Sequence, residues 1–491
     1  MPGSPPPAPS DYSPRRLAAF VLTLAATFVD LVDASVLNVA LPALRADLHA
    51  STTQLEWAIA GYTLAFAAGL ITGARLGDRL GRLRVFQVGL AAFTLASALT
   101  GAAGAPGPLI AARVAQGTAA ALMVPQVLAM LRVEFPPEEQ SRAATLYGLV
   151  FSVGGIGGPL LGGALLHADL FGLGWRPIFY VNVPIGVAAL IGTAVLGRES
   201  RAERAADADG RGLVLSTAAL LTLLFPLVEG RALDWPWWCV PVAALCPVLL
   251  YALLRHERAL AHRGGTPLFE PALLRLRATA GGVAAATLFF AGTAYTLVLS
   301  VHLQTGVGLS PLRAALTMAP FAVGVGLFSP FATRLRPLGR RLAVLGSLVL
   351  AGAMGAVLVV VGHEGERLRP WHLAPWLLIG GVGMSMASGV LVATVLARTP
   401  ARHAGAAAAL VGTAIQVGVA AGVALVGTVY FGLLDAGHSP TEAAVGGLST
   451  VVALYVLAAP AALVLPGGRL TFTTAAAEPP PLTRSAASPG R

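Results

Sequence analysis

The sequence predicts an all-helical protein that crosses a membrane many times. Of its 491 residues, 56% are hydrophobic and only 11% carry a charge, and the mean hydropathy is +0.75. Uncharged apolar runs of about twenty residues recur from end to end, and a helix of that length crosses a hydrocarbon core of about 30 Å. This composition excludes a chain of ordinary soluble domains.

The distribution of arginine predicts the orientation in the membrane. All 33 basic residues are arginine, and most of them fall in alternate loops. Because an excess of basic residues marks the cytoplasmic side, we expect a multi-pass protein of the cell membrane with both termini in the cytoplasm. Since topology accounts for the net charge of +10, no nucleic-acid partner is expected. Cys239 and Cys246 lie seven residues apart in one apolar run, which predicts neither a disulfide framework nor a metal site.

Fourteen membrane-spanning helices are expected, in groups of six, two and six. The proline-rich tails at 1–16 and 467–491 are expected to be disordered and cytoplasmic. A six-helix bundle is expected over 17–197, two inserted helices with charged loops over 198–277, and a second six-helix bundle over 278–466. The spans are placed at 17–41, 57–74, 85–103, 109–131, 143–166, 178–196, 213–228, 237–254, 279–303, 314–333, 342–361, 374–397, 404–433 and 443–465.

The fifth expected span contains an unusually glycine-rich stretch. In water so many glycines and a proline would break a helix, whereas in lipid the backbone bonds are kept and small residues let neighbouring helices approach closely. We expect this helix to act as a conformational pivot, and the alternative is a tightly packed membrane helix without that role. The stretch has the spacing G-x-x-x-G-P-x-x-G-G, with Gly154, Gly158, Pro159, Gly162 and Gly163.

Three charged side chains are expected well inside the hydrocarbon: Asp30, Asp33 and Arg113. A charge at the centre of a membrane helix costs about 2.5–3.5 kcal/mol, so each one needs a partner or a wet cavity. Asp30 and Asp33 are three residues apart and share a helix face, where repulsion between two carboxylates favours one of them being protonated. These groups suit proton coupling, in which a proton is bound on one side of the membrane and released on the other. The alternative for Asp33 is a structural ion pair with Arg113.

Polar and aromatic side chains within the spans are candidates for lining a substrate cavity. For each of them the alternative is a hydrogen bond between two helices. The apolar remainder of the spans suits a large hydrophobic or cationic organic molecule. The candidates are Asn38, Tyr62, Gln126, Asn182, His302, Gln304 and Gln416.

Several segments resemble, in the same order along the chain, the motifs of the fourteen-span drug/proton antiporter branch of the major facilitator superfamily. In the loop motif G-x-L-x-D-R-x-G-R, Ala74 replaces the first glycine. The matching segments are 33–42 in the first helix, 74–84 in the loop after the second, 113–117 (R-x-x-Q-G) in the fourth, 154–163 in the fifth, 175–184 at the start of the sixth, and 308–311 in the corresponding loop of the second half.

The resemblance implies a major facilitator fold of two six-helix bundles plus two inserted helices, and proton-coupled export of drugs, antibiotics or natural products by alternating access. It also implies that Asp33 couples the proton and that Arg113 tunes proton binding or organises the cavity. Conformational gating is assigned by the resemblance to the glycine stretch and to the loop residues Asp78, Arg79, Gly81 and Arg82. The expected partners are a small-molecule substrate, protons and the lipid bilayer, with no cofactor, and the expected state is a monomer.

An enzyme is not expected, because the sequence contains no H-E-x-x-H or G-x-S-x-G motif and no paired histidines within the spans. It contains no Walker A sequence either, so ATP is not the expected energy source. A proton-coupled symporter or a lipid-precursor flippase on the same fold is the alternative to an exporter.

Overall fold

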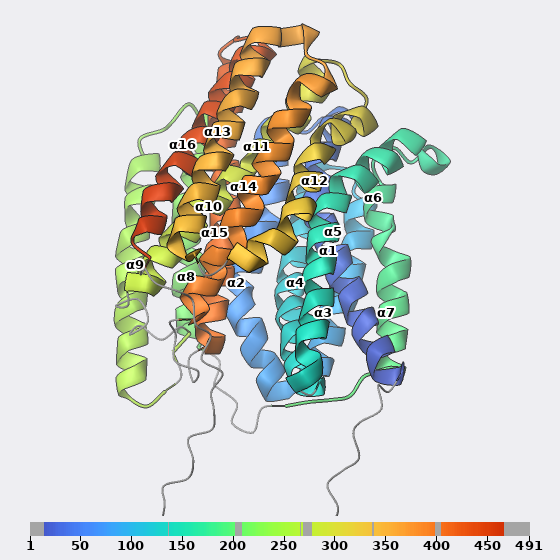
Figure 1. Cartoon of the computed structure of the whole chain (residues 1–491), viewed down its shortest axis with the longest axis vertical. Coiled ribbons are helices and arrows are strands. Elements are labelled where there is room, and N and C mark those ends of the chain that lie inside the picture. Colours follow the sequence, from blue (N-terminus) through green and yellow to red (C-terminus); the bar gives the residue numbers. More distant parts are fainter. Residues whose placement is uncertain are drawn as a thin grey trace, which may run out of the picture.

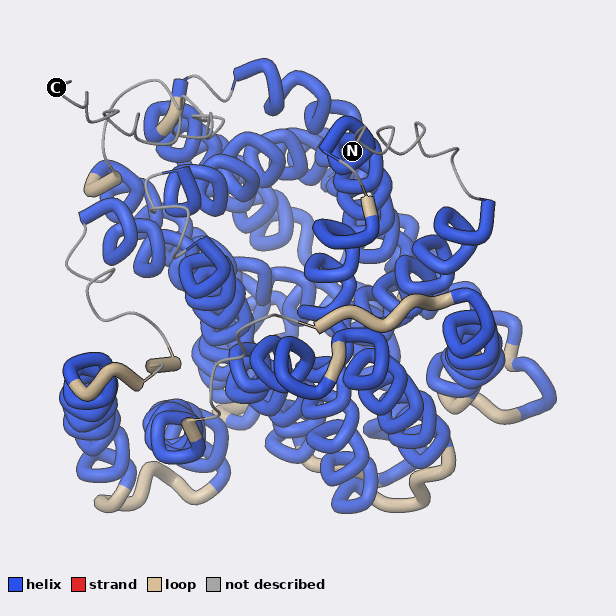
Figure 2. The backbone as a smooth tube through the Cα atoms, turned by 90° about the horizontal axis from the view of Figure 1, so that it is seen from below, coloured by secondary structure: helices blue, strands red, loops and turns tan. Residues whose placement is uncertain are grey.

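The computed structural model describes residues 14–135, 137–201, 209–265, 267–268, 277–335, 338–397 and 404–465. Every regular element within these ranges is a helix, and none is a strand (Figures 1 and 2). Thirteen segments of the described chain are long and apolar enough to cross a membrane. The prediction of an all-α polytopic membrane protein is therefore confirmed. A further 32-residue helix, Pro137–Ala168, is compatible with the expected total of fourteen spans.

The first set of helices follows the expected order closely. α1 begins at Pro14, so residues 14–16 of the predicted tail are helical, whereas the rest of both predicted tails lies outside the described residues. The sixth expected span is interrupted at Val181, because the ring of Pro184 excludes a helical hydrogen bond to the carbonyl of Tyr180. The elements are α1 (Pro14–Leu48), α2 (Thr52–Leu80), α3 (Arg82–Gly101), α4 (Pro106–Glu134), α5 (Pro137–Ala168), η1 (Leu170–Gly172), α6 (Pro177–Tyr180) and α7 (Asn182–Leu196).

The remaining helices include one span that is not a regular α-helix. The expected span 279–303 contains a 3₁₀ turn at Gly292–Ala294, and a π-helical turn follows it at His302–Gly306. A Cβ atom at Gly292 would lie 2.4 Å from the ring of Tyr455, so α16 packs directly on this backbone. The elements are α8 (Gly210–Ala232), α9 (Cys239–His262), α10 (Arg277–Ala291), η3 (Gly292–Ala294), α11 (Tyr295–Val301), η4 (His302–Gly306), α12 (Pro311–Leu335), α13 (Arg340–Glu364), η6 (Gly365–Arg367), α14 (Pro370–Ala397), α15 (Ala404–Asp435) and α16 (Pro440–Leu463).

The helices before and after the inserted pair pack in the same pattern. In the first set, α2 packs on α4, α3 on α4, and α1 on both α5 and α7. In the second set, α12 packs on α14, α13 on α14, and α10 on both α15 and α16. The two sets meet where α2 packs on α15 and where α5 packs on α12. This reciprocal pairing is the arrangement expected of an internal repeat.

The inserted helices α8 and α9 form a hairpin at the edge of the bundle. They pack on each other, and α8 also contacts α2 and α15, so the hairpin borders the junction between the two sets. Helix α1 begins and α16 ends toward the lower side of Figure 1, which we call the termini side. The side at which α1 ends is called the opposite side. The functional residues described next lie between these two sides.

Candidate functional site

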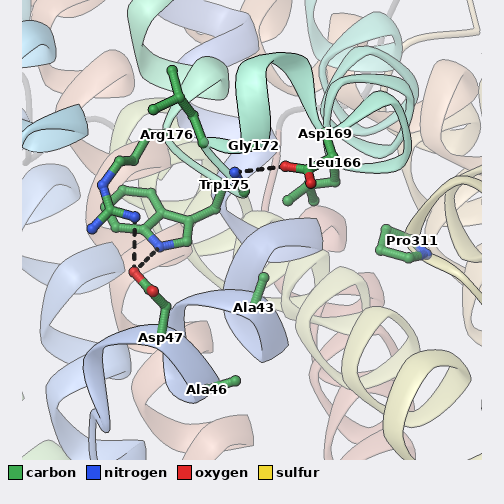
Figure 3. Close-up of a pocket in the computed structure, with 11 residues that line it drawn as sticks. Ala43, Ala46, Asp47, Leu166, Asp169, Gly172, Trp175, Arg176 and Pro311 are labelled. Atoms are coloured by element: carbon green, nitrogen blue, oxygen red, sulfur yellow. Dashed lines mark hydrogen bonds and ion pairs between the residues drawn. The ribbon is translucent and has the colours of Figure 1, made fainter.

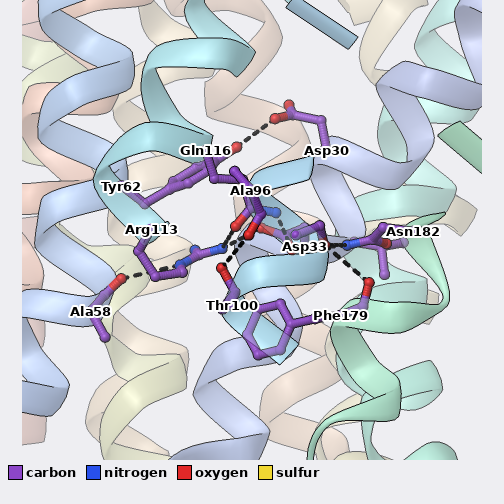
Figure 4. A network of polar contacts seen from close by, with 12 residues as sticks. Asp30, Asp33, Ala58, Tyr62, Ala96, Thr100, Arg113, Gln116, Phe179 and Asn182 are labelled. Atoms are coloured by element: carbon purple, nitrogen blue, oxygen red, sulfur yellow. Dashed lines mark hydrogen bonds and ion pairs between the residues drawn. The ribbon is translucent and has the colours of Figure 1, made fainter. Parts of the chain in front are cut away.

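A buried polar network surrounds Asp33 near the middle of α1 (Figure 4). The Asp33 side chain is 0% exposed and forms an ion pair with Arg113 of α4. Its Oδ1 atom also accepts hydrogen bonds from Gln116 Nε2 at 2.8 Å and from Asn182 Nδ2 at 3.0 Å. A carboxylate in an apolar interior needs its charge and its oxygens satisfied, and these three donors do so for Asp33. The network thereby ties α1 to α4 and α7.

The guanidinium of Arg113 is held by groups on three helices. Its Nε donates to the carbonyl of Ala58 on α2 at 3.2 Å, and its Nη1 donates to Gln116 Oε1 at 2.8 Å. The guanidinium carbon lies 4.3 Å from the centre of the Tyr62 ring, which is a cation–π contact. This mid-membrane arginine therefore has a counter-charge, two neutral hydrogen-bond acceptors and an aromatic ring as partners, which offset the cost of its burial. The predicted partnership of Asp33 and Arg113 exists as an ion pair.

Asp30 occupies a different environment one turn earlier on α1. Its side chain is buried and accepts a hydrogen bond from the hydroxyl of Tyr62 on α2 (Figure 4). No ion pair to Asp30 occurs within the described residues. The two acidic side chains thus lie in one helix but have distinct partners, a neutral phenol for Asp30 and a guanidinium for Asp33.

Two members of the network were not among the predicted site residues. Gln116 bridges Arg113 and Asp33, and its position in the R-x-x-Q-G segment was the available signal. Ser97 of α3 accepts a hydrogen bond from Asn182 at 2.9 Å and donates to the carbonyl of Phe179 at 3.0 Å. No sequence pattern singles out Ser97, since its role depends on α3 packing against α6 and α7.

The predicted cavity residues do not form one cluster. Tyr62 and Asn182 belong to the buried network, whereas Gln126 joins α4 to the carbonyl of Gly73 on α2 at 2.8 Å. Gln304 donates to the carbonyl of Val39 at 3.0 Å, which links the π-helical turn to α1. The remaining candidates are Asn38, half-buried on α1, His302, buried in the π-helical turn, and Gln416, half-buried on α15. A substrate role for any of them stays a prediction.

The loop between α2 and α3 is organised by Gly81 and Glu199. Arg82 donates to Asp78 at 2.8 Å, so two of the predicted gating residues form an ion pair across the loop. Gly81 has φ +113°, and a Cβ there would lie 2.5 Å from the carboxyl carbon of Glu199. Glu199, a residue that sequence reasoning missed, accepts from the backbone N–H of Leu83 at 3.1 Å and so caps α3. Arg79 is exposed.

The glycine stretch of α5 packs against α1 next to the acidic residues. A Cβ at Gly158 would lie 1.9 Å from Ser35 Oγ and 3.0 Å from the carbonyl oxygen of Val32, so the two backbones are close. Gly154 faces Leu31 of α1, and Gly162 faces Val36. Gly163 is turned the other way, where a Cβ would lie 2.9 Å from Pro311 O of α12. Pro159 is half-buried within the uninterrupted helix.

A second buried ion-pair cluster joins the inserted hairpin to both sets of helices on the opposite side. Arg231 of α8 lies 3.4 Å from Glu56 of α2 and also pairs with Asp435 of α15. Its Nη2 donates to Thr52 Oγ1 at 3.0 Å. The Glu56 side chain is 1% exposed, whereas that of Asp435 is 57% exposed. The sequence did not indicate these contacts, because each partner comes from a different helix end.

Replacing Arg231 with methionine is expected to destabilise the protein by about 3–5 kcal/mol, because the buried Glu56 carboxyl group would lose its cation partner. Asp435→Asn is the matched control and should cost at most about 1 kcal/mol, since the Asp435 carboxylate is itself exposed and Arg231 keeps Glu56 as a partner. Thermal unfolding of the purified variants in detergent measures both effects. Equal losses for the two variants would contradict the assignment of Glu56 as the buried partner.

An open hollow of about 580 Å³ lies on the opposite side, between the end of α1 and the loop after α5 (Figure 3). At its wall Asp47 accepts hydrogen bonds from Trp175 Nε1 and Arg176 Nη1, both at 2.9 Å. Pro311 of α12 lies across from them (Figure 3). The hollow is separate from the buried network and is lined by residues at the rim of both sets of helices.

Comparisons with known proteins agree with this architecture. The model of the Major Facilitator Superfamily matches residues 23–423. The chain is 40% identical to a probable actinorhodin transporter of Streptomyces coelicolor, over 90% of this chain and 78% of that protein. It is 34% identical to a puromycin resistance protein of Streptomyces alboniger, over 90% of this chain and 89% of that protein.

A solved structure has the same fold. It is a bacterial homologue of the human lysosomal transporter Spinster, in an inward-facing and occupied conformation. The TM-score is 0.62 at 17% identity, and the match covers 93% of this chain and 97% of that one. From the family match, the close relatives and the shared fold, the chain belongs to the Major Facilitator Superfamily and is a multi-pass membrane transporter.

Proposed function

We propose that this transporter exports a large hydrophobic or cationic organic compound of the antibiotic class in exchange for protons. The names of the two relatives, an actinorhodin transporter and a puromycin resistance protein, support a cargo of this kind. The observation that carries the proton coupling is the presence of two buried carboxyl groups, Asp30 and Asp33, one turn apart on α1. Of the two, Asp33 is the one with an ion pair in the described part of the chain.

The two acids have different parts in this proposal. Asp33 is paired with Arg113 and accepts hydrogen bonds from Gln116 and Asn182, and these contacts keep α1 attached to α4 and α7. Asp30 forms no ion pair within the described residues, and a neutral, protonated Asp30 needs no counter-charge in the buried interior. A proton arriving at Asp33 would release Arg113 and Asn182 and would loosen these helix contacts. Because the two acids are close, their protonation steps belong to the pair.

The contacts between the two sets of helices support a conformation closed on the opposite side. Ser300 of α11 donates to the carbonyl of Asn38 at 2.8 Å, and Gln304 donates to that of Val39 at 3.0 Å. The close approach of Gly163 to α12 lies toward the same side. Cargo would then enter from the termini side, which the arginine distribution assigns to the cytoplasm of a cell membrane. We propose that a monomer carries out this cycle by rocking between two such states.

Reconstitution into liposomes tests the exchange. Purified protein is reconstituted, a pH difference is imposed, and the movement of puromycin or of a fluorescent organic cation such as ethidium is followed. The expected result is movement of the compound against the proton flux, with protons released when the compound is added to the protein in detergent. Identical movement with and without a pH difference would overturn proton coupling, and movement of compound with the protons would indicate a symporter.

Asp30→Asn is expected to leave the fold intact but to abolish proton release on addition of the compound. The asparagine oxygen can still accept the Tyr62 hydroxyl, whereas the amide cannot exchange a proton at physiological pH. Asp234→Asn, at an exposed turn, is the control and should release protons like the unaltered protein. Proton release is measured with a pH indicator in weakly buffered solution. Undiminished release by Asp30→Asn would remove Asp30 from the coupling mechanism.

A further inference from the structure

A second group of chemically competent side chains lies at the termini side of the inserted hairpin, away from the Asp33 network. It consists of Asp209, which precedes the first residue of α8, and of His256 and Glu257 near the end of α9. The His256 Nε2 atom lies 2.9 Å from Asp209 Oδ1 and 3.1 Å from Oδ2. One ligand atom from each residue lies within 4.8 Å of the other two. Neither the transport proposal nor the family motifs use these residues.

Glu257 is the unusual member of this group. Its side chain is 0% exposed, and neither carboxylate oxygen has a hydrogen bond of good geometry within the described residues. The backbone N–H of Leu268 and the Asp209 carboxyl group are polar neighbours of this side chain. A buried carboxylate without a donor is costly, so such a group calls for a partner. The carboxylate is directed toward Asp209, since a Cβ added at Gly212 would lie 2.6 Å from Glu257 Oε1 and 2.4 Å from Asp209 Oδ2. Because Gly212 has no Cβ atom, the two carboxylates can occupy this space.

The charges around the group favour a divalent cation. Two carboxylates face a neutral or protonated imidazole, and Arg75 of α2 interacts electrostatically with both carboxylates. The Arg75 guanidinium donates to the carbonyl of Pro267. A single guanidinium balances one of the two carboxylates at most. A divalent cation would balance both and would supply the partner that Glu257 lacks.

The donor atoms select the class of metal. An imidazole nitrogen with two carboxylate oxygens is a set typical of Zn²⁺, whereas Ca²⁺ and Mg²⁺ prefer oxygen ligands only. Tetrahedral zinc with bonds of about 2.0–2.2 Å brings its ligands to roughly 3.4 Å from one another. His256 and Asp209, now 2.9 Å apart, would therefore separate slightly, and ligand atoms that are as much as 4.8 Å apart would approach. Three protein ligands leave the fourth position for water.

We propose that Asp209, His256 and Glu257 form a binding site for a divalent transition-metal ion of the zinc class. The ion would fasten the start of α8 to the end of α9. It would also steady the segment after α9, in which the carbonyl of Pro267 receives the hydrogen bond from Arg75. Because Arg75 precedes the gating loop residues Asp78 and Arg82, the metal site lies beside the part of the molecule expected to move during transport.

Metal titration of the full-length protein, purified without a histidine tag and stripped of metal, tests the site. Co²⁺ serves as the spectroscopic probe for zinc, and calorimetry with Zn²⁺ gives the stoichiometry and affinity. We expect one equivalent of either ion per chain and a rise in the unfolding temperature on binding, as for any ligand of the folded state. Mg²⁺ at the same concentration should not compete.

The variants separate this site from adventitious binding. His256→Ala should weaken Zn²⁺ affinity at least about tenfold, and Glu257→Gln should do the same. His262→Ala, an exposed histidine farther along α9, should bind as the unaltered protein does. His256→Cys keeps a zinc ligand and should retain stoichiometric binding with an altered Co²⁺ spectrum. The proposal is overturned if no saturable Zn²⁺ site is found, or if His256→Ala and Glu257→Gln both bind with unchanged affinity.

Discussion

Asp33→Asn is expected to abolish pH-driven transport and to destabilise the protein by about 3–5 kcal/mol. The loss of transport follows because an amide cannot take up or release the coupled proton. The loss of stability follows because Arg113, 1% exposed, would keep its charge in the membrane interior without a carboxylate. Gln116 and the Tyr62 ring remain near the guanidinium but do not neutralise it. Transport is measured in liposomes and stability by thermal unfolding.

The double variant Asp33→Asn with Arg113→Gln separates the two effects. It leaves no charge of the pair in the interior, so most of the lost stability should return. Transport driven by the pH difference should stay absent, because one of the two carboxyl groups of the coupling pair is still missing. If the single variant transports at the rate of the unaltered protein, Asp33 is not the coupling residue. If the double variant regains transport, the pair acts only in packing.

Gly158→Ala is expected to remove most of the transport activity through packing alone. The added methyl group would meet Ser35 Oγ at 1.9 Å and the backbone oxygen of Val32 at 3.0 Å, so α1 and α5 must separate. Overpacking of this kind costs about 1–3 kcal/mol. Gly157→Ala is the matched control, because a Cβ there meets no atom within 4 Å. The control should transport at the normal rate.

A second substitution tests whether the contact between Gly158 and α1 causes the loss of transport. Adding Ser35→Gly to Gly158→Ala removes the closest obstacle and leaves only the Val32 carbonyl, so part of the activity should return. Initial transport rates in liposomes, at matched protein content, measure this recovery. A Gly157→Ala variant as impaired as Gly158→Ala would show instead that the whole helix, and not its face on α1, is sensitive to size.

The buried network shows which features of the site the sequence can predict and which it cannot. A mid-span arginine and two mid-span acids are conspicuous in any apolar sequence, because membrane insertion penalises each one. From the sequence, Asp33 was expected either to couple protons or to form a structural ion pair with Arg113. The packing of α1 against α4 places Arg113 against Asp33, so the ion pair exists. Gln304 and Gln126 were equally conspicuous as polar residues, yet both hydrogen-bond to backbone carbonyls of neighbouring helices. A polar residue in a span therefore predicts a partner without identifying it.

The sequence by itself determined the all-helical membrane fold and the order of the spans. It also determined that Asp30, Asp33 and Arg113 are buried within the membrane-spanning helices. It could do so because hydropathy and the cost of burying charge act within single helices. Only the tertiary structure decided that Asn182 reaches Asp33 across 149 residues and that Arg231 holds Glu56 across 175. Such contacts depend on which helix faces meet, and helix packing between distant segments sets those faces.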